Sequence, residues 1–124
     1  MKKTALVALA AGVATTLALL GAAGWYCYNA AAGPQAGGLK LANALGLFDV
    51  HGNVWEWCQD WYADDAYASA ERSNPLGPPG GRHRVDRGGS FWGDADGARA
   101  ANRDWSSPDL AFRFLGFRVV CPAP

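Results

Sequence analysis

The sequence lacks the patterns that mark several common kinds of site. Its three cysteines form no CxxC pair or zinc-ligand spacing, and it has neither an HExxH motif nor a nucleotide-binding glycine loop. From residue 33 onward nine basic residues accompany eleven acidic ones, so the body carries no positive excess. Because general nucleic-acid binders usually carry such an excess, we expect no nucleic-acid partner.

Charge is almost absent from the beginning of the chain. A lysine pair is followed by an uncharged stretch over residues 5–24, and no acidic residue precedes Asp49. This pattern predicts a secretory signal peptide or an uncleaved signal-anchor over residues 1–32, with cleavage after Ala23 or Ala32. We therefore expect an exported protein that is periplasmic, secreted or membrane-anchored, and that meets the membrane only through this segment.

Two other interpretations of the same segment are open. Cys27 would suit a lipoprotein, although the bulky Trp25 and Tyr26 stand where a lipobox has small residues. A buried alanine-rich helix would explain neither the lysine pair nor its position at the start of the chain. A signal peptide or an anchor explains both features.

The remainder of the chain is rich in turns. Residues 33–42 are predicted to be a linker, and residues 64–81, with their proline and glycine pairs, a long surface loop. Short strands are expected within Arg82–Ser90, where Val85 points inward, and at Phe117–Val120.

Such a body can bury only a thin core, in which we expect Phe91 and Phe117. About 90 residues with few strands bury a modest share of their surface. A disulfide, a metal ion or a partner would therefore help to stabilise the fold. In an oxidising compartment Cys58 and Cys121 are expected to form that disulfide.

Aromatic rings and carboxylates crowd into the run GLFDVHGNVWEWCQDWY, at residues 46–62. Its three tryptophans would share one face of a strand and are expected to be core anchors. Asp49 and Glu56 could converge on one hard cation, with main-chain oxygens from the turn between them. Alternatively, the two carboxylates cap backbone amides. His51 is expected to be structural or exposed rather than a metal ligand.

Five blocks of sequence resemble the formylglycine-generating enzyme family, the sulfatase-modifying factor domain. In chain order they are NALGLFDVHGNVWEWCQDWY, RVDRGGSF, ARAANR, SPD and LGFRVV. The resemblance implies an α+β, C-type-lectin-like fold that is loop-rich with short strands. It covers residues 43–121, which resemble only the C-terminal part of such a domain. A missing N-terminal half is therefore one expected partner.

The resemblance also implies a structural calcium site in the aromatic run. On matching positions the ligands would be the side chains of Asp49 and Glu56 and the main-chain oxygens of Gly52 and Val54. Some members of the family carry Asn at the position of Asp49, and Asp is a compatible oxygen donor.

The catalytic members of the family oxidise a sulfatase cysteine to formylglycine with O₂ and copper(I), which two cysteines hold. Thiolates are the soft ligands that copper(I) prefers. In this chain the corresponding stretch, RGGSFWGDADGARAANR, contains no cysteine. We therefore expect no copper and no such activity; a sulfatase-modifying oxidase, or a fragment of one, is the alternative.

The same fold serves as a display scaffold in variable proteins of diversity-generating retroelements. Their variable positions lie between fixed anchors, and this chain keeps the anchors RGGS, AANR, PD and GFR. Large rings beside short polar groups form a paratope-like mixture. The resemblance thus favours a non-catalytic, exported domain that binds a protein or small molecule through Trp92, Asp94, Asp96, Asp104, Trp105, Phe112, Arg113 and Phe114.

Overall fold

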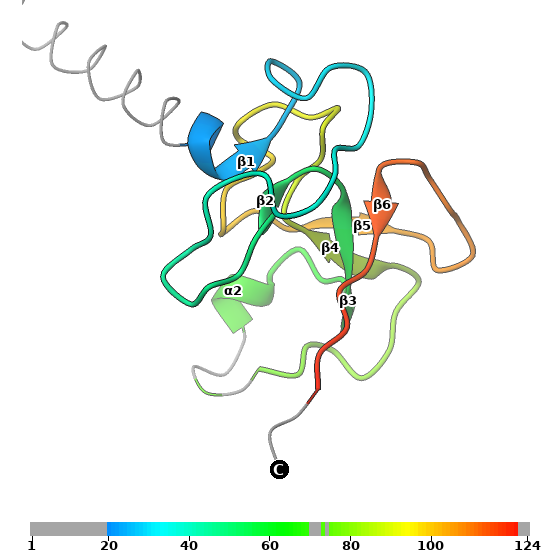
Figure 1. Ribbon diagram of the computed structural model, residues 1–124. Helices are drawn as coiled ribbons and strands as arrows, with labels where there is room; N and C mark the ends of the chain where they lie inside the picture. Colours follow the sequence, from blue (N-terminus) through cyan, green and yellow to red (C-terminus); the bar gives the residue numbers. More distant parts are fainter. Residues whose placement is uncertain (1–19, 70–72, 74, 122–124) are drawn as a thin grey trace, which may run out of the picture.

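The computed structural model describes residues 20–69, 73 and 75–121, which form a loop-rich body around short strands (Figure 1). Two strands pair in parallel, and four others form a sheet in the order β5-β4-β3-β6. In chain order the elements are β1 (Gly24–Trp25), β2 (His51–Gly52), β3 (Trp55–Trp61), α2 (Ala66–Ser69), β4 (Arg84–Arg87), β5 (Asp104–Ser106) and β6 (Leu115–Gly116).

Strand β3 lies at the centre of the main sheet. It pairs antiparallel with β4 and parallel with β6. Trp57 and Trp61 lie opposite Asp86 and Arg84, so these two tryptophans share one face, as predicted. All three tryptophans of the strand are nevertheless only half-buried, which corrects the expectation that they anchor the core.

The core is small and is built mainly by other residues. Its buried hydrophobic side chains are Tyr26, Ala30, Val85, Phe91 and Ala98. Val85 in β4 is inward, as predicted, and Phe91 is 1% exposed. A core of this size explains why large apolar side chains remain on the surface.

The RGGS block brings Phe91 into that core. Gly89 has a φ of 77°, and a Cβ at this position would lie 2.8 Å from the backbone nitrogen of Ala98. Glycine therefore allows the chain to turn sharply after β4 and to pass close to the 97–98 backbone. Behind the turn, the Phe91 amide donates to the Asn53 carbonyl at 2.7 Å.

Residues 24–38 belong to the folded body, which corrects the predicted linker and the boundary at residue 43. β1 pairs with β2, and the Gln35 amide donates to Asn53 Oδ1 at 2.8 Å. Cleavage after Ala32 would remove two of the buried core residues, whereas cleavage after Ala23 would keep them.

The predicted signal peptide or anchor falls largely on residues 1–19, outside the residues that the structure describes. Within the described part of the chain, no helix has the length and apolar character needed to cross a membrane.

The closing strand is shorter than predicted and lies earlier. β6 covers only Leu115–Gly116, and residues 117–120 form no strand. Phe117 is 77% exposed, which corrects its predicted place in the core. From β6 the chain runs down past the lower end of β3 (Figure 1). The side chains of Phe117, Val119 and Val120 in this segment are exposed.

Candidate functional site

The predicted cation ligands lie along residues 49–56, from just before β2 to the start of β3. Asp49 and Asn53 have positive φ angles of 56° and 66°, and Gly52 has a φ of 79°. Asp49 Oδ2 accepts a 2.7 Å hydrogen bond from the Gly38 amide. Asp49 Oδ1 is buried and has no hydrogen-bond partner among the described residues. One carboxylate oxygen is therefore free to meet a cation.

Glu56 is engaged differently. Its Oε1 lies 2.6 Å from Arg118 Nη2, and its Oε2 accepts from Arg118 Nε at 2.9 Å. This bidentate pair raises the pKa of Arg118 and occupies both oxygens of Glu56. Among the described residues no three His, Cys, Asp or Glu side chains are arranged so that they could hold a metal ion by themselves. Asp49 thus fits a calcium ligand, while Glu56 would have to share its oxygens with Arg118.

His51 has the structural role that the sequence predicted. Its ring nitrogen Nδ1 lies 2.9 Å from the Ala98 carbonyl oxygen. The contact connects the turn before β3 to the segment that follows the RGGS block.

Strand β4 buries one carboxylate in the sheet. Asp86 is 3% exposed; its Oδ2 accepts from Ser106 Oγ at 2.7 Å, and Oδ1 has no partner among the described residues. Burial raises the pKa of Asp86 against the lowering effect of the Ser106 bond. The folded protein therefore holds the Asp86 proton more tightly than the unfolded chain does. This difference stabilises the fold at low pH, and the stabilisation is lost as the pH rises through the raised pKa of Asp86.

The structure does not form the predicted disulfide between Cys58 and Cys121. Cys58 is a half-buried free thiol in β3, and its Sγ lies 3.9 Å from the Glu56 carbonyl oxygen. Burial, and next the charge of Asp60, raise the pKa of Cys58. The thiol therefore stays neutral and is a weak nucleophile or metal ligand.

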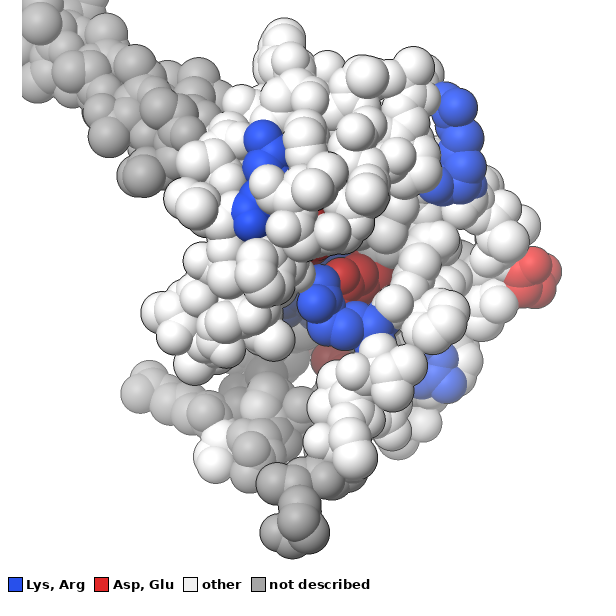
Figure 2. Space-filling model, in the orientation of Figure 1, with Lys and Arg blue, Asp and Glu red and all other residues white. Residues whose placement is uncertain are grey.

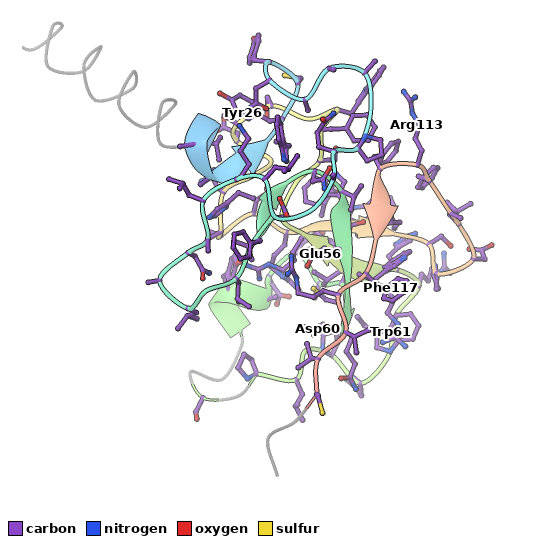
Figure 3. All side chains as sticks on the ribbon, viewed as in Figure 1. Tyr26, Glu56, Asp60, Trp61, Arg113 and Phe117 are labelled. Carbon is purple, nitrogen blue, oxygen red and sulfur yellow. The ribbon has the colours of Figure 1, made fainter. Side chains whose placement is uncertain are left out.

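Part of the predicted ligand-binding set gathers on the surface. The Arg113 guanidinium lies 5.2 Å from the ring centroid of Trp92, and the rings of Phe112 and Phe114 stack at 5.1 Å. Trp92 is 66% exposed. Figure 3 shows Arg113 on the loop that leads to β6, pointing away from the centrally placed Glu56.

The aspartates beside this cluster mainly order their own loop. Asp94 Oδ1 accepts a hydrogen bond from the Gly97 amide at 3.1 Å. Asp96 forms an exposed pair with Arg99 at 3.6 Å, a contact that contributes little to stability. Both aspartates lie within four positions of Trp92 in the sequence.

Asp104 and Trp105 lie apart from the cluster, on β5, whereas Phe112 and Phe114 lead to β6 at the opposite edge of the sheet. Trp105 packs on His83 with ring centroids 4.1 Å apart. Sequence reasoning missed this neighbour, and no local pattern could reveal it because His83 lies 22 positions earlier. The eight predicted residues therefore do not form a single patch.

The fold, the turn before β3 and the RGGS turn together define a domain of the formylglycine-generating-enzyme type. Residues 17–123 match the family described as sulfatase-modifying factor enzyme 1-like domain. The chain belongs to this family. The predicted resemblance and the loop-rich α+β fold class are thereby confirmed, and the fold is consistent with the C-type-lectin-like type.

Relatives with different names share this domain. Serine/threonine-protein kinase Pkn1 of Chlamydia trachomatis serovar L2 is 47% identical over 81 residues, which are 64% of this chain and 13% of that protein. Formylglycine-generating enzyme of Thermomonospora curvata is 43% identical over 84 residues, which are 63% of this chain and 28% of that enzyme.

The structure of Treponema denticola variable protein 1 is also similar. It has a TM-score of 0.71 and 36% identity, over 81% of this chain and 36% of that one. This chain therefore spans well under half the length of each of these three proteins. Family membership sets the fold, and the activity has to be argued from the residues.

Proposed function

We propose that this protein is a non-catalytic, exported member of the family that binds a protein or small-molecule ligand through a cluster formed by Trp92 and Arg113, together with the stacked rings of Phe112 and Phe114 on the same loop. The observation that carries the proposal is the Arg113 guanidinium 5.2 Å from the exposed Trp92 ring. An exposed tryptophan supplies a large, rigid contact area at little cost in side-chain entropy, and the neighbouring guanidinium adds a positive charge that can pair with a ligand.

Two further observations support this function. The stretch between RGGS and AANR contains no cysteine, so the copper(I) ligands of the catalytic members are missing. The match to Treponema variable protein 1 favours a variable surface on the same scaffold. Diversification by a retroelement is also part of this proposal. It predicts an adenine-rich near-copy of codons 84–120 beside a reverse transcriptase gene.

The test uses the full chain and a phage-displayed peptide library. Peptides selected on the protein are expected to bind a Trp92→Ala variant at least about tenfold more weakly, because aromatic anchors dominate binding energy. Leu76→Ala is the matched control, since Leu76 is another exposed apolar residue, outside the cluster.

Two results would contradict the proposal. One is equal binding by the Trp92 and Leu76 variants, which would place recognition elsewhere. The other is conversion of a sulfatase-derived cysteine peptide to formylglycine with copper and O₂, which would establish the alternative oxidase.

We also propose a structural calcium ion beside Asp49, with the main-chain oxygens of Gly52 and Val54 and with Glu56 as further ligands. The buried Asp49 Oδ1, which has no partner among the described residues, supports this site. A bound ion would supply a fixed positive charge that pins the turn before β3.

Calcium is expected to raise the Tm of the full chain by several degrees relative to chelator, because a ligand that binds only the folded state stabilises it. Asp49→Ala should abolish the rise, whereas Asp94→Ala should keep it. The control is matched because each aspartate accepts one glycine amide bond. Terbium luminescence provides a second readout, and a calcium response that survives Asp49→Ala would exclude this site.

A further inference from the structure

A short apolar surface lies next to β1, on the segment that precedes the aromatic run. Leu39 and Leu41 are 66% and 67% exposed. Lys40, between them, is packed inward instead, and its Nζ lies 3.9 Å from the ring centroid of Trp25 in β1. The two leucines therefore project into solvent on either side of a basic residue that covers an aromatic ring.

Hydrogen bonds fix this surface to the residues just before β1. The Leu41 amide donates to the Ala22 carbonyl at 3.0 Å, and Lys40 Nζ donates to the Gly21 carbonyl. Residues 20–23 are helical and lead directly into β1 (Figure 1). Cleavage after Ala23 would remove both acceptors, so these contacts of the body require that residues 21 and 22 stay attached.

The sequence that leads to this point has the length of a bilayer span. Residues 5–24 carry no charge, and a helix of that many residues extends about 30 Å, the thickness of the hydrocarbon core. In an anchor of this length, Gly21 and Ala22 lie at the end of the span. Because the Leu41 amide bonds to Ala22, Leu39 and Leu41 must then lie in the headgroup region.

The residue types of this surface suit a membrane–water interface. Tryptophan is enriched at this level of a bilayer, and lysine places its charged end there while its stem covers apolar surface. Trp25 and Lys40 are a pair of this kind, and no acidic residue precedes Asp49. The Asp49 carboxylate is itself engaged with the Gly38 amide. In Figure 2 the coloured atoms over β1 are basic, which favours contact with anionic headgroups.

We infer that the surface formed by Leu39 and Leu41, with Lys40 and Trp25 behind it, lies on the lipid bilayer into which residues 5–24 insert as an uncleaved anchor. The leucine side chains enter the headgroup region, and Lys40 lies beside the lipid phosphates. The contact fixes the orientation of the body on the membrane, which a tether alone would leave free. The inference rests on the proposed export of the protein and adds the bilayer as the partner of this surface.

The test uses the full chain, exported in a bacterial host and reconstituted in nanodiscs of phosphatidylcholine and phosphatidylglycerol. Mass spectrometry first establishes whether residues 1–24 remain attached. Leucine methyl signals are then recorded by NMR with and without a lipid that carries a spin label at the top of its acyl chain. The Leu39 and Leu41 signals are expected to be lost through paramagnetic broadening. The signal of Leu76 should persist, because residues 75–79 lie at the other end of the body from β1 (Figure 1).

Leu41→Asp distinguishes contact with the bilayer from tethering alone. The anchor is unchanged in this variant, but a carboxylate opposes entry into the apolar part of the bilayer, so the Leu39 signal should survive the spin label. Leu76→Asp is the matched control and should leave the broadening of Leu39 unchanged. Since Leu41 and Leu76 are both exposed, neither replacement removes a core contact.

Four results would overturn the inference. Leu39 and Leu41 signals that survive in the anchored parent protein would assign this surface to a second copy or to another protein. Equal broadening of Leu39 in the two variants would show that the leucines do not make the contact. Cleavage after Ala23 with release of the body would remove the anchor and leave the proposed export intact. Retention of the chain in the cytoplasm would contradict the export itself, and this inference with it.

Discussion

Phe91→Ala is expected to abolish cooperative unfolding of the isolated chain. Truncation of a fully buried phenylalanine costs about 3–5 kcal/mol. Phe91 is 1% exposed and is one of five buried hydrophobic residues in the described part of the chain. The loss therefore approaches the whole stability of a small domain, which is typically about 5–15 kcal/mol. Thermal melts followed by circular dichroism should show no transition or a strongly lowered Tm.

Trp92→Ala is the matched control for this variant. The two aromatic residues are neighbours in sequence, but Trp92 is 66% exposed and Phe91 only 1%. Trp92→Ala should change the free energy of unfolding by about 0.5 kcal/mol or less. If both variants melted like the parent protein, the core would lie elsewhere.

Gly52→Ala is the second large expected effect. Gly52 has a φ of 79°, and a Cβ there would overlap the main chain of Trp25 in the neighbouring strand. The positive φ alone costs of order 1–3 kcal/mol, and the overlap separates β1 from β2. Urea unfolding should show a clearly lowered midpoint, and the Asn53 amide, which donates to the Trp25 carbonyl at 2.8 Å, should exchange faster.

Gly33→Ala tests whether this effect is specific to position 52. A Cβ added to Gly33 would have no atom within 4 Å, and the φ of this residue is not positive, so an alanine fits there without strain. The unfolding midpoint of this variant should be unchanged or slightly higher. An equal loss at both positions would show that the effect of Gly52→Ala is not specific to the β1–β2 contact.

Local pattern is a good guide where neighbouring residues decide the structure. The Gly-Asn turn after Asp49, the inward Val85 and the glycine pair before Ser90 could all be predicted from sequence. Each depends on interactions within a few positions, such as φ preference or strand alternation. His51 was likewise predicted to be structural, and it contacts the Ala98 carbonyl.

Contacts between distant segments could not be predicted in this way. Alternation with Arg118 suggests that Phe117 is buried, yet β6 ends at Gly116 and Phe117 is 77% exposed. Residues 33–42 have the composition of a linker, yet Gln35 bonds to Asn53. Trp105 was grouped with the residues before β6, although strand order places it on the other edge of the sheet.

Residue identities alone are enough to assign the family, to place Phe91 in the core and to show that no cysteine lies between the RGGS and AANR blocks. These features follow from short spacings, which the chain carries whether or not it is folded. Three others need the folded sheet: the pairing of Glu56 with Arg118, the separation of Trp105 from Phe112 and Phe114 across the sheet, and the exposed position of Phe117. They depend on which strands become neighbours, because segments tens of residues apart in sequence meet only when the whole sheet forms.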